Sequence, residues 1–378
     1  MSSQSIELIS AGLLTTVQDL GRRGYQRYGI PVCGALDPVS LRIANVLVGN
    51  PEGEACLEIT ALGPTIRFIS DSVVALVGAD FKIDLDGREV RTWESVEVSA
   101  GSILSIGAAS DGLRAYLAIA GGIDVPPVMN SRSTDLKGVF GGFEGRPLQD
   151  GDSLPVGDSP HVADWSQRGL PAGISRQPTF GQEFQIRVVL GPQDGEFTQT
   201  GIDTMLTSEY TVSVDSDRMG YRLEGAEITH ERGPDIVSDG TALGSVQVPG
   251  SGQPIILLAD RGTTGGYTKI ATVIAPDIGL LSQALPGAKV RFTAVSVEEA
   301  HEAQREQESM IREIKSHVDL DLTGAVSVRS EGSEVRVVDE SGGRIAVPDV
   351  TGSRTSTRTI STIADGEEFE FELTTAFQ

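Results

Sequence analysis

The sequence predicts a mainly β protein, built as barrels or sandwiches, with few helices. Short apolar runs recur at regular spacing with Gly, Asp or Pro between them, which is typical of antiparallel strands. Helical periodicity is confined to two segments, residues 39–47 and 297–316. The chain has 378 residues, more than one typical domain, so we expect two domains, each with its own core.

The first domain is assigned to residues 1–165. It opens with a strand-like run at 6–9, and Asp37 and Pro38 then mark a helix start, with Asp37 as the N-cap. Apolar residues recur at helical spacing over 39–47, and Gly49 ends the helix. The remaining strands of this domain are predicted at 55–60, 65–69, 73–77, 81–85, 96–98, 103–106 and 114–119.

The second domain is assigned to residues 166–296, because the Pro-containing segment 155–178 lacks periodicity. A surface helix follows at 297–318, with an acidic start, a basic finish and a thin apolar face. Residues 319–378 are predicted to form an acidic C-terminal extension, either β-rich or partly ordered, whose function the residues do not indicate. The strands of the second domain are predicted at 184–190, 210–214, 246–248, 254–258, 270–274 and 290–293.

The charge balance excludes several classes of partner. The net charge is −23, and such a surface repels polyphosphate backbones, so we expect no nucleic acid. The 53 acidic residues stand beside 25 arginines and only 5 lysines, which favours a protein adapted to concentrated salt over an acidic mesophilic protein of GC-rich coding. No window reaches the length of a membrane span, and the two cysteines, Cys33 and Cys56, are too few for a disulfide framework. We therefore expect a cytoplasmic protein.

Common catalytic motifs are missing from the sequence. It contains no G-x-x-x-x-G-K-[ST], no G-x-S-x-G and no H-E-x-x-H, and its four histidines stand singly. We expect no metal site, no thiol nucleophile and no self-contained nucleotidase. Cys33 and Cys56 are better explained as small buried apolar residues.

The segment 238–276 concentrates the polar chemistry. Two strand-like runs, 245–248 and 254–259, flank a Pro-Gly-Ser-Gly turn and predict a hairpin. The chain then passes a charged pair, hydroxyls, two glycines, a phenol and a lysine within ten residues: Asp260, Arg261, Thr263, Thr264, Gly265, Gly266, Tyr267 and Lys269. Glycines let backbone N–H groups approach a ligand, and cations hold carboxylate or phosphate. An ordinary loop, in which Asp260 pairs with Arg261 or Lys269, is the alternative.

Long blocks of the sequence resemble the biotin-dependent carboxyltransferase family, also called allophanate hydrolase subunit 2, which includes the C component of 5-oxoprolinase. The segment LGSVQVPGSGQPIILLADRGTTGGYTKIATVIAPD is similar to a family signature, and residues 12–68, 114–152 and 216–225 resemble three further blocks. Together they cover most of residues 6–317. The resemblance implies that both domains are cyclophilin-like β-barrels, and it does not extend to residues 319–378.

The resemblance also implies the function. We expect a C-type component of ATP-dependent 5-oxoprolinase, which converts 5-oxoproline to L-glutamate beside a B-type (allophanate hydrolase subunit 1-like) protein and an A-type protein. ATP then acts at the level of the complex, and any biotin is carried by another polypeptide, because no lysine here adjoins a methionine. The alternatives are the carboxyltransferase half of a urea or amide carboxylase that uses carboxybiotin, and a regulatory module that antagonises a kinase inhibitor.

The site implied by the resemblance has two parts. Asp260, Arg261 and Lys269 are predicted to be catalytic, because carboxyl transfer or lactam opening needs cations where charge develops on oxygen. Substrate contacts are predicted from Thr263, Thr264, Gly265, Gly266, Tyr267, Gln18, Asp19, Arg22, Arg132, Ser133 and Thr134. For the residues before position 135, structural ion pairs and turn caps are the alternative. Three positions depart from the usual family pattern: Gly262 stands for Gln, Thr268 for Pro and Asp135 for an aromatic residue.

Overall fold

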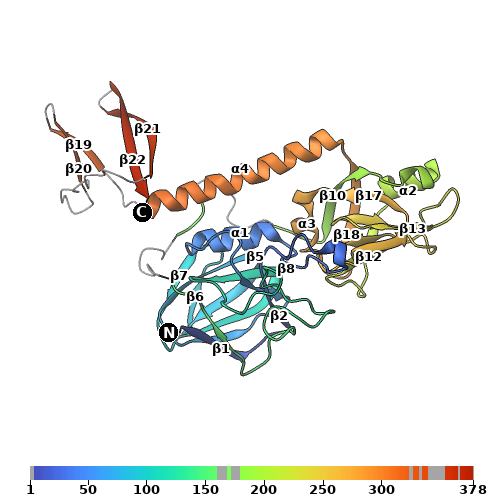
Figure 1. The fold of residues 1–378 in the computed structure, drawn as a ribbon, viewed down its shortest axis with the longest axis horizontal. Helices are drawn as coiled ribbons and strands as arrows, with labels where there is room; N and C mark the ends of the chain where they lie inside the picture. Colours follow the sequence, from blue (N-terminus) through green and yellow to red (C-terminus); the bar gives the residue numbers. More distant parts are fainter. Residues whose placement is uncertain are drawn as a thin grey trace. The chain divides into compact units, whose positions relative to one another are not determined.

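The computed structural model describes residues 4–159, 168–171, 179–322, 327–331, 334–338, 354–364 and 367–377. The chain forms two compact units, Met1–Leu322 and Thr323–Gln378. Strands dominate the first unit, and only a few helices accompany them (Figure 1). The predicted mainly β class is therefore confirmed, whereas the predicted boundary near residue 165 stays a prediction.

The N-terminal part of the first unit is a curled nine-stranded sheet. Its strands pair in the order β2-β3-β8-β4-β1-β9, and β5 pairs with β6, β7 and β8. The strands are β1 Ser5–Ser10, β2 Leu14–Gln18, β3 Cys56–Thr60, β4 Thr65–Phe68, β5 Ser72–Leu85, β6 Arg88–Val90, β7 Ser95–Val98, β8 Ile103–Ile119 and β9 Ser153–Pro155.

Two strands of this sheet are longer than the sequence predicts. The runs at 73–77 and 81–85 belong to one strand, β5, and those at 103–106 and 114–119 belong to β8. The register of the β5–β8 pair shifts between Gly78 and Ile83, so the strands bend without ending. Gly78 has a φ of 127°, and a Cβ there would lie 2.5 Å from the carbonyl oxygen of Arg114. Bulges at small residues therefore explain why the alternation looked broken.

Helix α1, Pro38–Leu47, begins as predicted. The Asp37 side chain accepts a hydrogen bond from the Ser40 amide, and Pro38 occupies the first turn. The apolar face of the helix packs on the sheet, where Leu41, Ile43 and Leu47 are almost fully buried. Burying such side chains contributes about 1.5–3 kcal/mol each before entropy is counted.

The second part of the unit is a closed barrel in the order β10-β17-β14-β15-β12-β11-β18. Its strands are β10 Glu183–Leu190, β11 Tyr210–Val212, β12 Gly220–Glu224, β14 Ser245–Gln247, β15 Ile255–Leu257, β17 Lys269–Val273 and β18 Lys289–Ala294. The predicted hairpin is the antiparallel pair β14–β15. Two strands outside the barrel, β13 Asp235–Gly240 and β16 Thr264–Tyr267, form a separate antiparallel ribbon.

Among the described residues, the remaining helices are short except for one. They are the 3-10 turns η1 Gln26–Tyr28 and η3 Asp194–Glu196, and the α-helices α2 Gln199–Thr207, α3 Ala275–Leu281 and α4 Val297–Leu322. The long helix α4 exposes most of its polar residues, as predicted, but buries Ile314 and Val318 against the core that contains α1. None of the helices described is both long and apolar enough to cross a bilayer.

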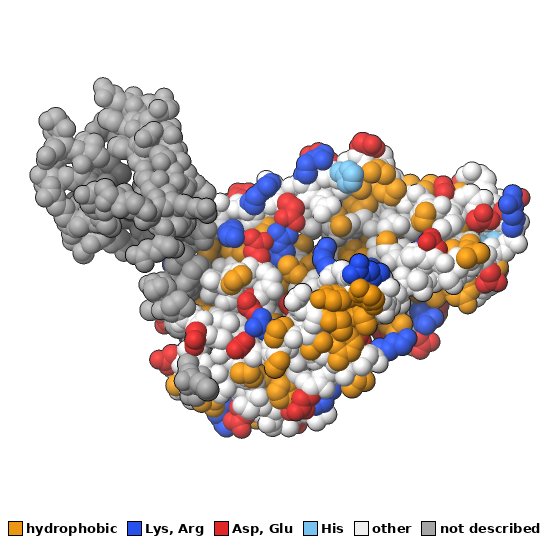
Figure 2. All heavy atoms as spheres, in the orientation of Figure 1, with side chains coloured by type: hydrophobic (Ala, Val, Ile, Leu, Met, Phe, Trp, Pro, Cys, Tyr) orange, Lys and Arg blue, Asp and Glu red, His pale blue; other side chains and the backbone are white. Residues whose placement is uncertain are grey.

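The second unit contains two separate strand pairs. β19 Ser327–Glu331 pairs with β20 Glu334–Val338, and β21 Arg354–Ala364 pairs with β22 Glu367–Phe377. The β-rich form of the predicted extension is thus present among the described residues of the unit. On the described part of the face drawn in Figure 2, basic and acidic side chains are interspersed rather than gathered in a stripe of one sign.

Candidate functional site

The β13–β16 ribbon carries most of the predicted loop. The sequence suggested a loop at 263–266, but Thr264–Tyr267 is a strand. In this strand Gly265 pairs with Asp239 and Thr264 pairs with Gly240. Nearly every residue of the ribbon is partly or fully exposed, including Tyr267. Arg261 precedes the ribbon strand and Lys269 follows it, so the ribbon connects the two predicted cations.

Lys269 is a buried cation. Only 1% of its surface is exposed, and its Nζ makes no hydrogen bond within the described part of the chain. The nearest carboxylate oxygen is Oδ2 of Asp239, 3.6 Å away, beyond the roughly 3.2 Å limit of a good hydrogen bond. Gln193 fixes the lysine backbone from both sides, since its amide donates to the Lys269 carbonyl and its Oε1 accepts from the Lys269 amide.

Gln247 is a second buried donor without a partner. It pairs with Lys269 in the β14–β17 register, it is 7% exposed, and its Nε2 makes no hydrogen bond with any described residue. A Cβ placed on Gly265 would lie 2.4 Å from this Nε2. The two unpartnered donors therefore meet at one rung of the ribbon, since Asp239 lies beside Lys269 and its pair Gly265 lies beside Gln247.

Arg261 binds no carboxylate in the described structure. Its Nε donates to the Thr241 carbonyl at 3.2 Å and its Nη1 to the Leu258 carbonyl at 3.1 Å. Burial lowers the pKa of its guanidinium below the ordinary value. An arginine side chain nevertheless stays protonated at neutral pH. Its charge is therefore not neutralised by an adjacent anion, which suits it to bind one.

Asp260 takes part in a buried ion-pair network. Both of its carboxylate oxygens accept from Arg218, at 2.9 and 3.0 Å, and Arg218 also binds Glu58 of β3 and donates to the Gly34 carbonyl at 2.6 Å. Burial raises the pKa of Asp260, and Arg218 partly offsets this; burial also acts to raise the pKa of Glu58, but Arg218 and Arg114 outweigh it and lower that pKa. The network joins the barrel to the N-terminal sheet.

Tyr116 and Gln283 extend the network. The Tyr116 hydroxyl donates to Glu58 at 2.7 Å and accepts from the Asp37 amide at 2.7 Å, while Gln283 binds the Asp37 carboxylate and the Arg114 carbonyl. Burial raises the pKa of Asp37 and of Tyr116. The carboxylates of Glu58, Asp260 and Asp37 all accept hydrogen bonds, which makes this network a structural connection between the two sheets.

Arg22 lies where the N-terminal block meets the barrel. The Cys33 amide donates to the Ala259 carbonyl at 3.1 Å, and Cys33 experiences the charges of Asp260 and Arg22. Arg22 is 1% exposed; its Nη2 binds the Ser133 carbonyl, its guanidinium lies over Phe140, and its Nε and Nη1 make no hydrogen bond in the described structure. Burial raises the pKa of the Cys33 thiol, which agrees with an unreactive cysteine.

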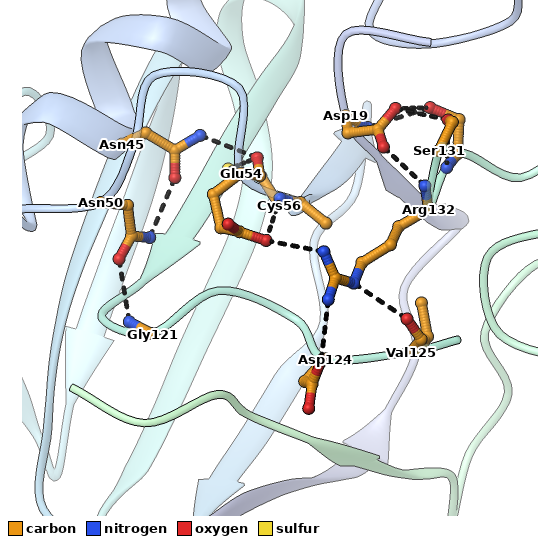
Figure 3. A network of polar contacts seen from close by, with 12 residues as sticks. Asp19, Asn45, Asn50, Glu54, Cys56, Gly121, Asp124, Val125, Ser131 and Arg132 are labelled. Atoms are coloured by element: carbon orange, nitrogen blue, oxygen red, sulfur yellow. Dashed lines mark hydrogen bonds and ion pairs between the residues drawn. The ribbon is translucent and has the colours of Figure 1, made fainter. Parts of the chain in front are cut away.

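The other residues predicted in the N-terminal block hold that block together. Asp19 accepts from the hydroxyls of Ser131 and Ser133 and from the Arg132 amide, and Arg132 binds Glu54, Asp124 and the Val125 carbonyl (Figure 3). Thr134 donates to the Val17 carbonyl and Gln18 to the Thr134 carbonyl. These contacts are turn and strand connections, and no described contact takes them to residues 260–269. Their role as substrate contacts stays a prediction.

The arrangement suits anion binding more than metal binding. No group of three potential His, Cys, Asp or Glu ligands occurs among the residues that the structure describes. By contrast Arg261, Lys269 and Gln247 offer unpaired charge or unpaired donors next to glycines. A carboxylate or phosphate held there would gain charge-assisted hydrogen bonds.

Sequence reasoning missed Gln247 and Asp239. The signal for Gln247 was available, because a glutamine stands in the apolar run Ser245–Val248 and all four residues are buried. Asp239 gave no such signal, since a carboxylate in an exposed strand is ordinary. Arg218 and Glu58 were also missed as partners, because nothing in the spacing relates residues 58 and 218.

Known proteins similar to this chain are of two kinds. It is 42% identical to the C component of the 5-oxoprolinase of Escherichia coli over 82% of this chain and 97% of that protein, and 38% identical to the same component from Haemophilus influenzae over 83% and 99%. It is also 33% identical to the urea amidolyase of Saccharomyces cerevisiae, over 82% of this chain but only 18% of that enzyme.

Solved structures and a family description agree with these relatives. The crystal structure of the Kluyveromyces lactis urea amidolyase matches with a TM-score of 0.77 and 32% identity over 81% of this chain, which spans a fifth of that enzyme. Residues 28–294 match the family described as carboxyltransferase domain, subdomain A and B. With most of its first unit inside that match, this chain belongs to the carboxyltransferase domain family.

Proposed function

We propose that this chain is the C component of an ATP-dependent 5-oxoprolinase, which opens 5-oxoproline to L-glutamate. The observation that carries the proposal is the match to two such C components over 97% and 99% of their own length. A chain whose first unit corresponds to a whole component is expected to share that component's assembly. Its partners are then a B-type protein and an A-type protein, in the cytoplasm.

The residues of this chain supply electrostatic stabilisation in the proposed reaction. Opening a lactam develops negative charge on oxygen, and preorganised donors in a site that excludes water stabilise that charge. Neither Arg261 nor Lys269 has a hydrogen-bonded carboxylate in the described structure, and the amides of Gly265 and Gly266 lie between them in the chain. Asp260 has a positioning role: its ion pair with Arg218 fixes the start of the loop.

ATP and biotin would act through the complex. ATP supplies activation of the amide when it is bound, and the chain's phosphate-compatible donors are Arg261 and Lys269. A carboxylated biotin on another polypeptide would meet the same cations, which fit its carboxylate. The residues present are therefore compatible with either group.

Carboxyl transfer to urea or another amide is the second candidate function. The urea amidolyase relative and the solved urea amidolyase structure favour it, because both contain a domain that matches this chain over more than 80% of its length. This chain matches only about a fifth of those enzymes. In this second function, separate chains would therefore supply the other domains.

The test is reconstitution. The chain is purified with and without its neighbouring components, and ATP hydrolysis is measured with 5-oxoproline, with urea and with neither. Turnover that needs 5-oxoproline and the full set of components supports the proposal, and urea-dependent turnover supports the second candidate. Tight assembly without any turnover would instead indicate a regulatory module. Arg261→Ala and Lys269→Ala should abolish turnover while assembly persists, and full turnover in both variants would refute the site assignment.

A further inference from the structure

We propose that Lys269 and Gln247 bind the carboxylate of the substrate beneath the β13–β16 ribbon, and that Asp239 occupies the entrance to this subsite when no ligand is bound. The inference rests on the proposed function for the identity of the substrate, 5-oxoproline, but the subsite itself is argued from the contacts of this chain.

Two unpartnered donors are buried under the ribbon residues Asp239 and Gly265. Lys269 and Gln247 are at least nine-tenths buried, and neither Nζ nor Nε2 has a hydrogen-bond partner among the described residues. Leaving a buried donor unpaired costs about 1–3 kcal/mol, and more for a charged group. Two such donors on paired positions of neighbouring strands indicate a place built for an acceptor from outside the chain.

The two donors lie next to one paired position of the ribbon, Asp239 and Gly265. Nζ of Lys269 lies 3.6 Å from the Asp239 carboxylate, and Nε2 of Gln247 lies beside Cα of Gly265, the residue paired with Asp239. A carboxylate has two oxygens, so one oxygen can accept from the ammonium and the other from the amide. Gly265 has no side chain that would displace Gln247 from this rung.

Asp239 is the carboxylate that lies next to the ammonium of Lys269. Its side chain is 59% exposed, and it stays too far from Nζ for a hydrogen bond, so it offers the buried ammonium an opposite charge without satisfying its donors. A ligand carboxylate that reaches both donors makes stronger contacts than Asp239 does. An exposed two-stranded ribbon has low local stability, so its displacement costs little free energy. The ribbon can therefore move to admit the ligand.

Binding to the full-length chain tests the inference without catalysis. Calorimetric titration with 5-oxoproline, with 2-pyrrolidone, which lacks the carboxylate, and with inorganic phosphate distinguishes a carboxylate site from a general anion site. We expect 5-oxoproline to bind at least about 10-fold more tightly than 2-pyrrolidone, because 2-pyrrolidone cannot form the charge-assisted hydrogen bond to Lys269. Equal binding of both compounds would overturn the inference, as would phosphate binding as tight as 5-oxoproline.

Variants supply the sharper test. Lys269→Met should weaken 5-oxoproline binding about 10- to 100-fold, whereas Asp239→Asn should tighten it several-fold, because it removes the competing carboxylate. A merely structural ion pair predicts no tightening in Asp239→Asn, so unchanged or weaker binding in that variant contradicts the inference. Circular dichroism confirms that each variant is folded.

Two glycines on opposite strands of the ribbon, Gly265 and Gly240, give a matched control. Gly265→Ala places a methyl group 2.4 Å from Nε2 of Gln247, whereas the Cβ of Gly240→Ala meets nothing within 4 Å on the partner strand. Binding should be lost in Gly265→Ala and kept in Gly240→Ala. Equal binding in both would count against a role for Gln247.

The outcome remains separable from the proposed function. If the reconstituted complex turns over 5-oxoproline while Lys269→Met and Asp239→Asn leave its KM unchanged, the subsite is wrong and the function stands. If the complex is inactive on 5-oxoproline, the function is wrong, and titration with acetate and malonate, repeated in the same variants, decides whether the carboxylate subsite exists.

Discussion

Replacement of Lys269 by Met should make the protein more stable. Lys269 is 1% exposed and its ammonium lacks a hydrogen bond among the described residues, so the folded state bears most of the desolvation cost of this charge, which is several kcal/mol for an ion inside a protein. At 3.6 Å its attraction to Asp239 is about 1 kcal/mol in water-like surroundings and about 5 kcal/mol at an effective dielectric constant of 20. The 59% exposure of Asp239 places the value toward the lower end.

The cost therefore exceeds the gain, and methionine fills the space of the lysine stem without a charge. We expect a stabilisation of roughly 1–2 kcal/mol, which raises Tm by about 1–3 °C in a protein of this size. Differential scanning calorimetry measures it, beside the control Lys289→Met, another barrel lysine that donates to Thr211 at 2.8 Å and is 42% exposed. A Tm for Lys269→Met below that of the control would refute the reasoning, because the ammonium would then be structurally required.

The remaining predictions concern the ion pairs and the net charge. Arg218→Met leaves Glu58 and Asp260 buried without their cation and should cost about 3–5 kcal/mol in urea unfolding, whereas Arg67→Met, which loses an exposed pair, should cost less than about 1 kcal/mol; equal losses would contradict this. The hydrogen bond from Arg42 lowers the pKa of Glu308, so the stabilisation by Glu308 is present above its unfolded pKa and lost as the pH falls through the folded one. The Tm difference between wild type and Glu308→Gln should therefore shrink as the pH falls from about 7 to about 3, and a constant difference would argue against the linkage. With a net charge of −23, Tm should rise with KCl, and a flat response would count against salt adaptation.

Sequence patterns predicted the structural elements that depend only on neighbouring residues. The cap formed by Asp37, the β14–β15 hairpin and the long helix α4 follow from neighbouring residues and were predicted. The strands β5 and β8 were each divided in two, because Gly78 and the register shift after it interrupt the apolar run although the pairing continues. The ribbon strand Thr264–Tyr267 was missed, since two glycines disfavour a strand and its pairing partners lie 24 to 32 residues earlier.

Some features of the candidate site could likewise be predicted from the sequence, and others depend on contacts between distant residues. Arg261 and Lys269 could be selected from their residue types, because cations beside glycines suggest an anion. The pairing of Asp260 with Arg218 rather than with Arg261 or Lys269 could not be predicted, since it depends on how the chain folds back over 42 residues. Burial of Lys269 is likewise a property of the closed barrel and of the ribbon.

Arg218 sits between two sheets and binds both, through Glu58 and the Gly34 carbonyl on one side and Asp260 on the other. A gene cut between the sheets would leave Arg218 and Asp260 paired on the barrel fragment and Glu58 on the other fragment without its ion-pair partner. The N-terminal fragment would then be a poor independent module, and co-expression would be needed to return Arg218 to Glu58. Exchange of either half with a relative should succeed only when the relative supplies the matching arginine or carboxylate.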